Sequence, residues 1–476
     1  MSAHRAALAA LLAALVPYFV LLVGLPASGD QDAAIHAIYS RWPLDGNPAP
    51  FPYRVLTVWS RPIFALAYAL PGQLGFTAMR VFTVAVCAVA GWLTYLLARR
   101  LALPHPWLAV PLTLLQPVML QVGMDVMTEP LFALLLAAGM LALESGRRVL
   151  AACLFSLLPL ARPEGGPVLA VLAAVWGLEA LRHRRALVPL LGLGLGLVLW
   201  EASVLALTGN WRYLLDTFPW PVQSDRWQGS PFHYLLRWPV ILGMAGLVPW
   251  LVGLRPSWRA GGSLRLCVLF VSAVLGVHAF LFATGGFAST GFERYFATLA
   301  PTNGLIALAG VAWLVERGAR WLRFVLPPLL AVQAVQGVLW IEGQPLAHLP
   351  KATLQTLQEA RSRVDLQGRF VIASDLHAFV FLDIDPGPSD ARLRASRNRA
   401  LERIEQLPAG TVVLWDNMVG KWWYGLDVED FTARGYQVLW EQEAELRSPL
   451  LNRPSGQQLR QAVLLRHTGP KQSLTP

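Results

Sequence analysis

Long apolar runs dominate the first two thirds of the chain. Windows of about 17–25 mostly apolar residues, the length of a membrane-spanning helix, recur from the N-terminus to residue 341. The predicted spans are 6–26, 79–98, 104–122, 130–144, 148–161, 163–181, 186–207, 238–254, 266–284, 296–315 and 323–341. This pattern predicts a polytopic α-helical membrane protein with about eleven transmembrane helices, of which the fourth and fifth are the shortest.

The pattern changes near Glu342, where charged residues return and no further long apolar run follows. Short runs of β-branched and aromatic residues then alternate with helical stretches. Strands are predicted at 369–373, 411–415, 436–440 and 462–465, and helices near 352–363, 391–406 and 429–434. We therefore expect a transmembrane domain over residues 1–341 and a small soluble α/β domain with a partly parallel sheet over residues 342–476.

The C-terminal domain contains no Gly-rich phosphate loop, HExxH or GxSxG motif. We expect it to cap the membrane domain or to recruit a partner, and not to catalyse. Its acids Asp375, Asp383 and Asp385 are candidate ligands, but solvated loop acids are the favoured interpretation.

Composition and charge support the membrane class and give it an orientation. Hydrophobic residues make up 55% of the chain and charged residues only 14%. The net charge of +10 comes largely from arginines in alternate short connections, which are typical of cytoplasmic loops. Arg5 places the N-terminus on the same side, so eleven crossings leave the C-terminal domain extracytoplasmic. This distribution fits a multi-pass protein of a bacterial inner (plasma) membrane and excludes a nucleic-acid surface.

Two further features bear on the exported parts. A cleaved signal peptide is the alternative interpretation of residues 1–29, but the apolar run is long and a retained helix is favoured. The three cysteines, Cys87, Cys153 and Cys267, all fall within predicted spans. A disulfide framework and a cysteine metal site are therefore not expected.

The loop after the first span carries two carboxylates, Asp30 and Asp32, at the membrane surface. An ionised acid near hydrocarbon is costly unless it has a partner or a function. Apolar residues at helical spacing predict an amphipathic interfacial helix over residues 31–42. Asp32 and His36 share one face of this helix, because they are four residues apart. The two side chains fit part of a metal site, an acid–base pair or a solvent-exposed helix face equally well.

The remaining polar residues of interest gather in the predicted outward loops. The first outward loop, residues 27–62, continues into a Pro-punctuated segment at 51–71 that is too short to span and predicts a re-entrant or interfacial helix. The candidate site residues are Asp30, Asp32, His36, Arg61, Asp125, Glu129, Arg162, Glu164, Arg294 and Tyr295. Arginines beside carboxylates fit a substrate that carries phosphate on a lipid tail. A helix start at Glu129 and an interfacial anchor at Arg294 and Tyr295 are the structural alternatives.

The order of these motifs resembles the GT-C superfamily of integral-membrane glycosyltransferases, especially its mannosyl- and aminoarabinosyltransferase branch. That branch uses polyprenyl- or dolichyl-phosphate sugars as donors. The resemblance covers residues 6–341, and its carriers are Gly29-Asp30-Gln31-Asp32, Arg61-Pro62-Ile63-Phe64, Gly75 with Met79-Arg80-Val81, Thr128-Glu129-Pro130, Arg162-Pro163-Glu164-Gly165, and Arg294-Tyr295 with Pro301. Two positions depart from the family pattern: Gln31 separates acids that are often adjacent, and Ile63 replaces a second proline or histidine.

The resemblance implies inverting transfer of a sugar from a polyprenyl-phosphate donor to a lipid, glycan or protein acceptor at the extracytoplasmic face. Asp30 would be the general base, with Asp32 as the second choice. Arg294, with Arg61 or Arg162, would stabilise the leaving phosphate, and the other candidates would bind substrate. No cofactor is certain; a divalent cation, held by Asp32 and His36, is an open possibility.

Two other classes compete with this interpretation. A transporter or flippase of a lipid-linked or anionic substrate would show internal repeats and polar residues near the bilayer midplane, whereas here they gather at one face. An outward-facing polysaccharide ligase or polymerase is also arginine-rich. The acidic first loop favours the glycosyltransferase.

Overall fold

The computed structural model describes residues 3–27, 29–41, 61–183, 187–213, 216, 228–366, 369–382, 397–421, 425–448 and 450–466. The chain divides into two compact units. Unit 1 comprises Met1–Leu22 and Tyr39–Leu339, and unit 2 comprises Val23–Ile38 and Trp340–Pro476. The acidic loop therefore belongs to the unit that contains the C-terminal domain, although the sequence grouped it with the transmembrane domain.

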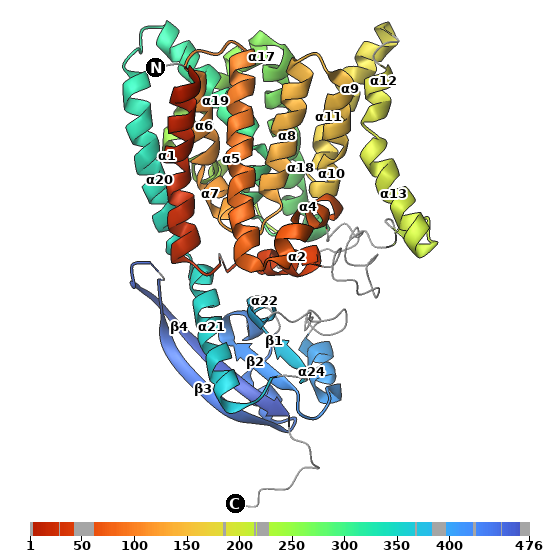
Figure 1. Ribbon diagram of the computed structural model, residues 1–476, viewed down its shortest axis with the longest axis vertical. Helices are drawn as coiled ribbons and strands as arrows, with labels where there is room; N and C mark the ends of the chain where they lie inside the picture. Colours follow the sequence, from red (N-terminus) through yellow and green to blue (C-terminus); the bar gives the residue numbers. More distant parts are fainter. Residues whose placement is uncertain are drawn as a thin grey trace, which may run out of the picture. The chain divides into compact units, whose positions relative to one another are not determined.

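Unit 1 is a bundle of helices that run alongside one another (Figure 1). In the described part of the chain, seven helical segments are long and apolar enough to cross a membrane. They are α1 (Ala3–Gly24), α5 (Phe76–Arg100), α11 (Gly165–Arg182), α12 (Leu187–Gly192) joined to α13 (Leu195–Thr208), α18 (Gly262–Thr284), η5 (Glu293–Leu299) joined to α19 (Ala300–Glu316), and α20 (Leu322–Glu342). The predicted class, a polytopic helical membrane protein, is confirmed.

The other four predicted spans are short or interrupted helices. They correspond to η1 (Pro106–Leu108) with α6 (Ala109–Leu114) and α7 (Pro117–Gly123), to α8 (Glu129–Glu144), to α9 (Arg148–Ser156) with α10 (Leu158–Ala161), and to α16 (Trp238–Leu242) with α17 (Met244–Ala260). Two breaks have clear causes. Pro117 cannot donate a helical hydrogen bond, and Gly243 has a φ of 76°, which favours glycine.

A single side chain satisfies backbone groups at both of these breaks. Gln333 of α20 is buried and donates from Nε2 to the carbonyl oxygens of Leu115, at 2.8 Å, and Leu242, at 3.1 Å. Its Oε1 accepts the Ala245 N–H at 2.9 Å. Broken helices at membrane depth need such partners, because no water is there to replace the lost hydrogen bonds.

The first span packs as part of unit 1. The Tyr18 side chain is fully buried, and its hydroxyl donates to the Leu114 carbonyl at 2.6 Å, where α6 ends. The hydrogen bond joins the first helix to the end of α6. In the part of the chain that the structure describes, Cys87, Cys153 and Cys267 are free thiols, of which Cys87 and Cys267 are buried.

Several short helices complete the description. The predicted helix at 31–42 is observed as α2 (Gln31–Arg41), while Trp42 and residues 51–60 lie outside the described residues. The predicted interfacial segment ends in α4 (Pro62–Gln73). Unit 1 also contains α15 (His233–Leu236) and η4 (Gly286–Ala288).

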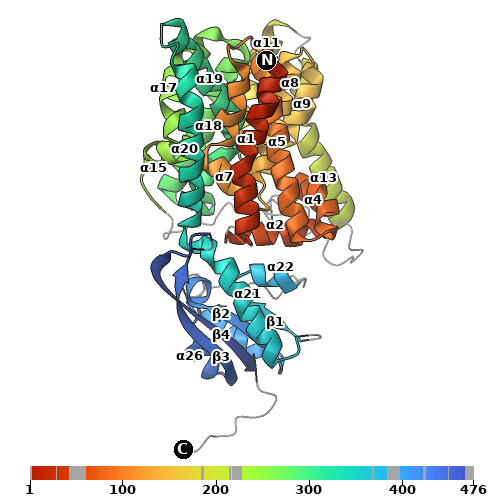
Figure 2. The same cartoon turned by 60° about the vertical axis from the view of Figure 1, so that its left-hand side comes forward.

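Unit 2 contains the predicted α/β domain. Its strands are β1 (Val371–Ala373), β2 (Val412–Asp416), β3 (Tyr436–Arg447) and β4 (Pro454–Arg466), in the order β1-β2-β4-β3. β1 and β2 are parallel and the other pairs are antiparallel, so the predicted partly parallel sheet is confirmed. The helical segments are α21 (Pro345–Arg363), α22 (His377–Leu382), α24 (Arg397–Gln406), η6 (Asn417–Lys421) and α26 (Val428–Thr432). Figure 2 shows α21 lying along the sheet.

Candidate active site

A buried cluster of charged side chains in unit 1 surrounds Arg162, in the turn between α10 and α11. The guanidinium of Arg162 binds Glu164 through two parallel contacts, Nε to Oε2 at 3.0 Å and Nη2 to Oε1 at 2.8 Å. Its Nη1 lies 2.8 Å from Glu129 Oε1 and donates to Thr128 Oγ1 at 2.8 Å. Every donor nitrogen of this arginine is therefore engaged, in the fork geometry that suits carboxylates.

The local sequence explains how Arg162 and Glu164 come to face each other. α10 ends at Ala161, Arg162 takes an extended backbone, and Glu164 is the N-cap residue of α11. A carboxylate at a helix N-terminus is stabilised by the helix dipole. Gly165 allows the start of α11 to pack closely against α10, because a methyl group at this position would overlap the backbone of Leu158 and Pro159. The four-residue turn is thus shaped to hold one ion pair.

A second arginine approaches the same cluster from η5. Arg294 Nη1 lies 3.4 Å from Glu129 Oε1, and both side chains are buried. Glu129 is the first residue of α8, so the helix-start interpretation of this residue is also correct. It begins the helix and links the two arginines at once.

Tyr295 lies close to both guanidinium groups. Its ring centroid is 5.5 Å from Arg162 Cζ and 5.8 Å from Arg294 Cζ, within the range of cation–π attraction. The ring also stacks on His278 at 4.9 Å, and its hydroxyl is 2.6 Å from Thr290 Oγ1. These contacts join residues that are far apart in the sequence.

His278 was not among the predicted site residues. Its Nε2 lies 3.5 Å from Glu164 Oε1. It falls inside the apolar run 266–284 and not in one of the predicted outward loops. An ionisable residue within a predicted span was the signal that could have identified it.

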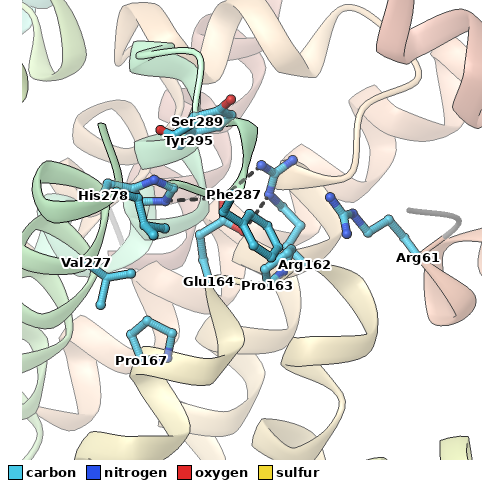
Figure 3. Close-up of a pocket in the computed structure, with 11 residues that line it drawn as sticks. Arg61, Arg162, Pro163, Glu164, Pro167, Val277, His278, Phe287, Ser289 and Tyr295 are labelled. Atoms are coloured by element: carbon cyan, nitrogen blue, oxygen red, sulfur yellow. Dashed lines mark hydrogen bonds and ion pairs between the residues drawn. The ribbon is translucent and has the colours of Figure 1, made fainter. Parts of the chain in front are cut away.

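A cavity of about 110 Å³ opens beside this cluster (Figure 3). Its charged and polar lining consists of Arg61, Arg162, Glu164, His278, Ser289 and Tyr295. The Arg61 side chain extends from the start of α4 toward Arg162. Among these lining groups, guanidinium groups outnumber carboxylates, so the cavity is suited to an anion.

Two residues that line the cavity have strained backbones. Arg61 has a φ of 55° and Phe287 a φ of 58°, although neither is glycine. Such conformations cost about 1–3 kcal/mol each and concentrate at functional sites. Three other non-glycine residues, Ala102, His105 and Asn452, share this conformation outside the cavity, so the strain agrees with a functional cavity without marking it uniquely.

The glutamates of the cluster are poor candidates for a general base. Burial would raise the pKa of Glu164, but the Arg162 guanidinium and the His278 contact outweigh it and hold that pKa well below its ordinary value. Glu129 contacts both arginines. Glu164 is therefore held as an anion, and the contacts of both glutamates suit them to positioning the arginines.

Asp125 is placed differently from the other predicted site residues of unit 1. It is fully buried, its Oδ1 accepts the Val126 N–H at 2.8 Å, and it interacts electrostatically with Arg80. Arg80 in turn donates to the Met124 carbonyl at 2.9 Å. Asp125 is absent from the cavity lining, and its contacts hold the turn between α7 and α8.

The acidic loop of unit 2 begins α2. Asp30 precedes the helix, and its Oδ1 accepts the Asp32 N–H at 3.0 Å, which is helix capping. Asp32 lies in the first turn, and His36 lies one turn later and is buried. Within the described ranges, no group of three or more His, Cys, Asp and Glu side chains could hold a metal ion.

Comparisons with known proteins identify the fold. A scan of protein-family models and a search of curated sequences found no match. Two solved structures are similar over nearly their whole length. The crystal structure of ArnT from Cupriavidus metallidurans in the apo state matches with a TM-score of 0.62 and 14% identity, covering 99% of this chain and 100% of that chain.

The same protein bound to undecaprenyl phosphate matches with a TM-score of 0.60 and 13% identity, covering 98% and 99% of the two chains. The resemblance noted in the sequence is therefore confirmed for the fold: this chain has the multi-pass membrane fold of ArnT, including the small C-terminal domain.

Proposed function

We propose that this protein is a membrane glycosyltransferase that moves a sugar from a polyprenyl-phosphate donor to a lipid, glycan or protein acceptor at the extracytoplasmic face. The observation that carries the proposal is the arginine-lined cavity of unit 1, on a fold that matches ArnT from end to end. One of the ArnT structures has undecaprenyl phosphate bound, which is the kind of lipid that this donor contains.

The donor phosphate is assigned to Arg61 as its direct ligand, with Arg162 supplying positive charge at the cavity wall, because both line the cavity while the nitrogens of Arg162 are engaged by Glu164, Glu129 and Thr128. Arg162 is held rigidly by Glu129 and Glu164, so it offers a fixed positive charge that needs no reorganisation during the reaction. Arg294, which lies 3.4 Å from Glu129, adds a second positive charge to the cluster. When the bond between the sugar and the phosphate breaks, the developing negative charge on the phosphate is stabilised by these guanidinium groups.

The general base is assigned to the acidic first loop, with Asp30 before Asp32. The base removes the proton of the acceptor hydroxyl, the hydroxyl oxygen attacks the anomeric carbon, and the polyprenyl phosphate leaves with its bonding electron pair. The configuration at the anomeric carbon is inverted. Glu129 and Glu164 are unsuited to this step because they are neutralised by arginine.

Sugar transfer from a labelled polyprenyl-phosphate donor tests the proposal. Membranes with the wild-type protein should release polyprenyl phosphate and label an acceptor, and Asp30→Asn should abolish this. Asparagine caps a helix as well as aspartate does, so this variant removes the charge and keeps the cap. Asp32→Asn tests the second choice of base and should retain activity if Asp30 is the base.

Three outcomes would count against the proposal. Full activity of Asp30→Asn together with loss of activity in Asp32→Asn would mean that Asp32, and not Asp30, is the general base. Full activity of both would remove the first-loop assignment. If the wild-type protein carries the intact donor across a vesicle membrane without cleaving it, the transporter interpretation is correct instead.

A further inference from the structure

Gln31, the residue between the two candidate bases, is held by the C-terminal domain. Its Nε2 donates to Asp375 Oδ1 at 2.8 Å, and its Oε1 accepts the Leu376 N–H at 2.8 Å. All three residues belong to unit 2. Both ends of the planar amide are thus fixed, which leaves the Gln31 side chain one orientation.

Asp375 is itself immobilised. It is buried, so the prediction of a solvated loop acid is wrong; Asp383 and Asp385, grouped with it, lie outside the described residues. Its Oδ1 accepts the backbone N–H of His377 at 3.0 Å and lies 2.8 Å from His377 Nδ1. Thr353 of α21 donates to Oδ2. The anchor for Gln31 is therefore built from the segment after β1 and from the helix that packs on the sheet.

The anchor matters because Gln31 lies between the two candidate bases at the start of α2. Gln31 is the first residue of α2, Asp30 caps that helix, and Asp32 follows in its first turn. The backbone bonds of Gln31 connect it directly to both acids. Fixing the side chain of Gln31 therefore fixes the backbone from which Asp30 and Asp32 project.

We propose that Gln31 and Asp375 are positioning residues, through which the C-terminal domain orients the first-loop carboxylates for proton abstraction. This inference rests on the proposed function. A base must sit within about 0.5 Å of its productive position, and an error of about 1 Å can cost about 100-fold in rate. The role also accounts for the glutamine that separates the two acids.

Substitutions at the two ends of the contact make the test specific. Gln31→Ala and Asp375→Ala remove the anchor. Asp375→Asn keeps it, because the asparagine Oδ1 accepts from Gln31 and His377 while Nδ2 donates to the Thr353 hydroxyl. Gln461→Ala is the matched control: Gln461 is a buried glutamine of the same unit that donates to Thr356 Oγ1 at 2.6 Å and does not touch Gln31.

The measurement is steady-state sugar transfer by the purified full-length protein. Gln31→Ala and Asp375→Ala should lower kcat about tenfold or more, leaving KM for the donor within about twofold, as misplacement of a base predicts. The double variant should be no slower than the slower single variant. Asp375→Asn and Gln461→Ala should keep wild-type kcat.

The failures are distinguishable. Wild-type kcat in Gln31→Ala, in a protein that Asp30→Asn inactivates, overturns the positioning role and leaves the proposed function intact. An equal loss of kcat in Gln461→Ala also overturns it, because general weakening of unit 2 would then suffice. Absence of sugar transfer by the wild-type protein overturns the proposed function and the inference together.

Discussion

Arg162 illustrates how much one side chain can organise in a water-poor environment. It is the common partner of two buried glutamates, and its planar fork satisfies Glu164 with two nitrogens while a third reaches Glu129. Ion pairs removed from water are favourable only when the geometry is good and the remaining polar groups are satisfied. Here the fork geometry is good and every nitrogen of Arg162 has a partner, so the residue type matters as much as the charge.

Arg162→Lys should therefore behave as a severe substitution. An ammonium cannot contact both carboxylates in the fork geometry, and an incompletely paired buried carboxylate costs about 3–5 kcal/mol. We expect a large fall in the melting temperature of the detergent-solubilised protein and loss of sugar transfer. Glu164→Gln in the Arg162→Lys background should recover part of the stability. If Arg162→Lys melts like the wild type, the fork is not needed.

At the scale of helices, unit 1 combines interrupted helices with long ones. The breaks at Leu115–Pro117 and Leu242–Met244 leave backbone groups without helical partners, and Gln333 of α20 supplies them. Three elements distant in sequence are thereby joined at one amide. The interrupted helices depend on α20 for more than apolar packing.

Gln333→Leu tests this dependence. The variant leaves the Leu115 and Leu242 carbonyls and the Ala245 N–H without their partner, and each buried unsatisfied group costs about 1–3 kcal/mol. The expected loss for the three groups together is about 3–9 kcal/mol, visible as a lower melting temperature in detergent. Val332→Leu, one residue away and 54% exposed, is the control and should melt like the wild type.

A second inter-helix contact depends on close backbone approach. α17 and α19 pack through Gly253 and Gly310, and a methyl group at Gly253 would overlap the Ile306 carbonyl oxygen. Small residues permit such contacts between membrane helices. Gly253→Ala should separate the two helices and lower the melting temperature. Gly276→Ala is the matched control, since open space surrounds that position in α18, and equal melting of the two variants would contradict the contact.

At the scale of the molecule, the sequence predicted the fold class because that class follows from hydropathy. Apolar length indicated the helices, and β-rich runs after residue 342 indicated the sheet. The interruptions at Pro117 and Gly243 were missed, because a hydropathy window averages over single residues. β3 and β4 are longer than predicted since their polar outer ends pair through backbone hydrogen bonds.

The sequence predicted which residues belong to the candidate site, but it did not predict which of them contact one another. Loop position selected Arg162, Glu164, Glu129 and Arg294, which the structure brings together. The partners of Gln31 were beyond reach, because Asp375 lies 344 residues away in the sequence and only the folded chain unites them.

The stability of unit 2 should depend on pH because of Asp416, which lies at the end of β2. Burial, and then the nearby charge of Asp375, raise the pKa of Asp416 from 3.8 to about 6. A raised pKa means that the folded state holds the proton more tightly than the unfolded state. The stability from this group is therefore complete below pH 3.8 and is lost as the pH rises through 6.

Asp416→Asn should remove this dependence while keeping the hydrogen bonds. The asparagine Oδ1 still accepts the Val419 N–H, and Nδ2 donates to the Ser374 hydroxyl, which donates to the Leu414 carbonyl. The native carboxylate costs up to about 3 kcal/mol above pH 6, since two pKa units correspond to that energy. Thermal unfolding of the full-length protein should show the variant more stable than the wild type at pH 8, with the difference shrinking at pH 5. A gap that is constant with pH would mean that Asp416 does not titrate in this range.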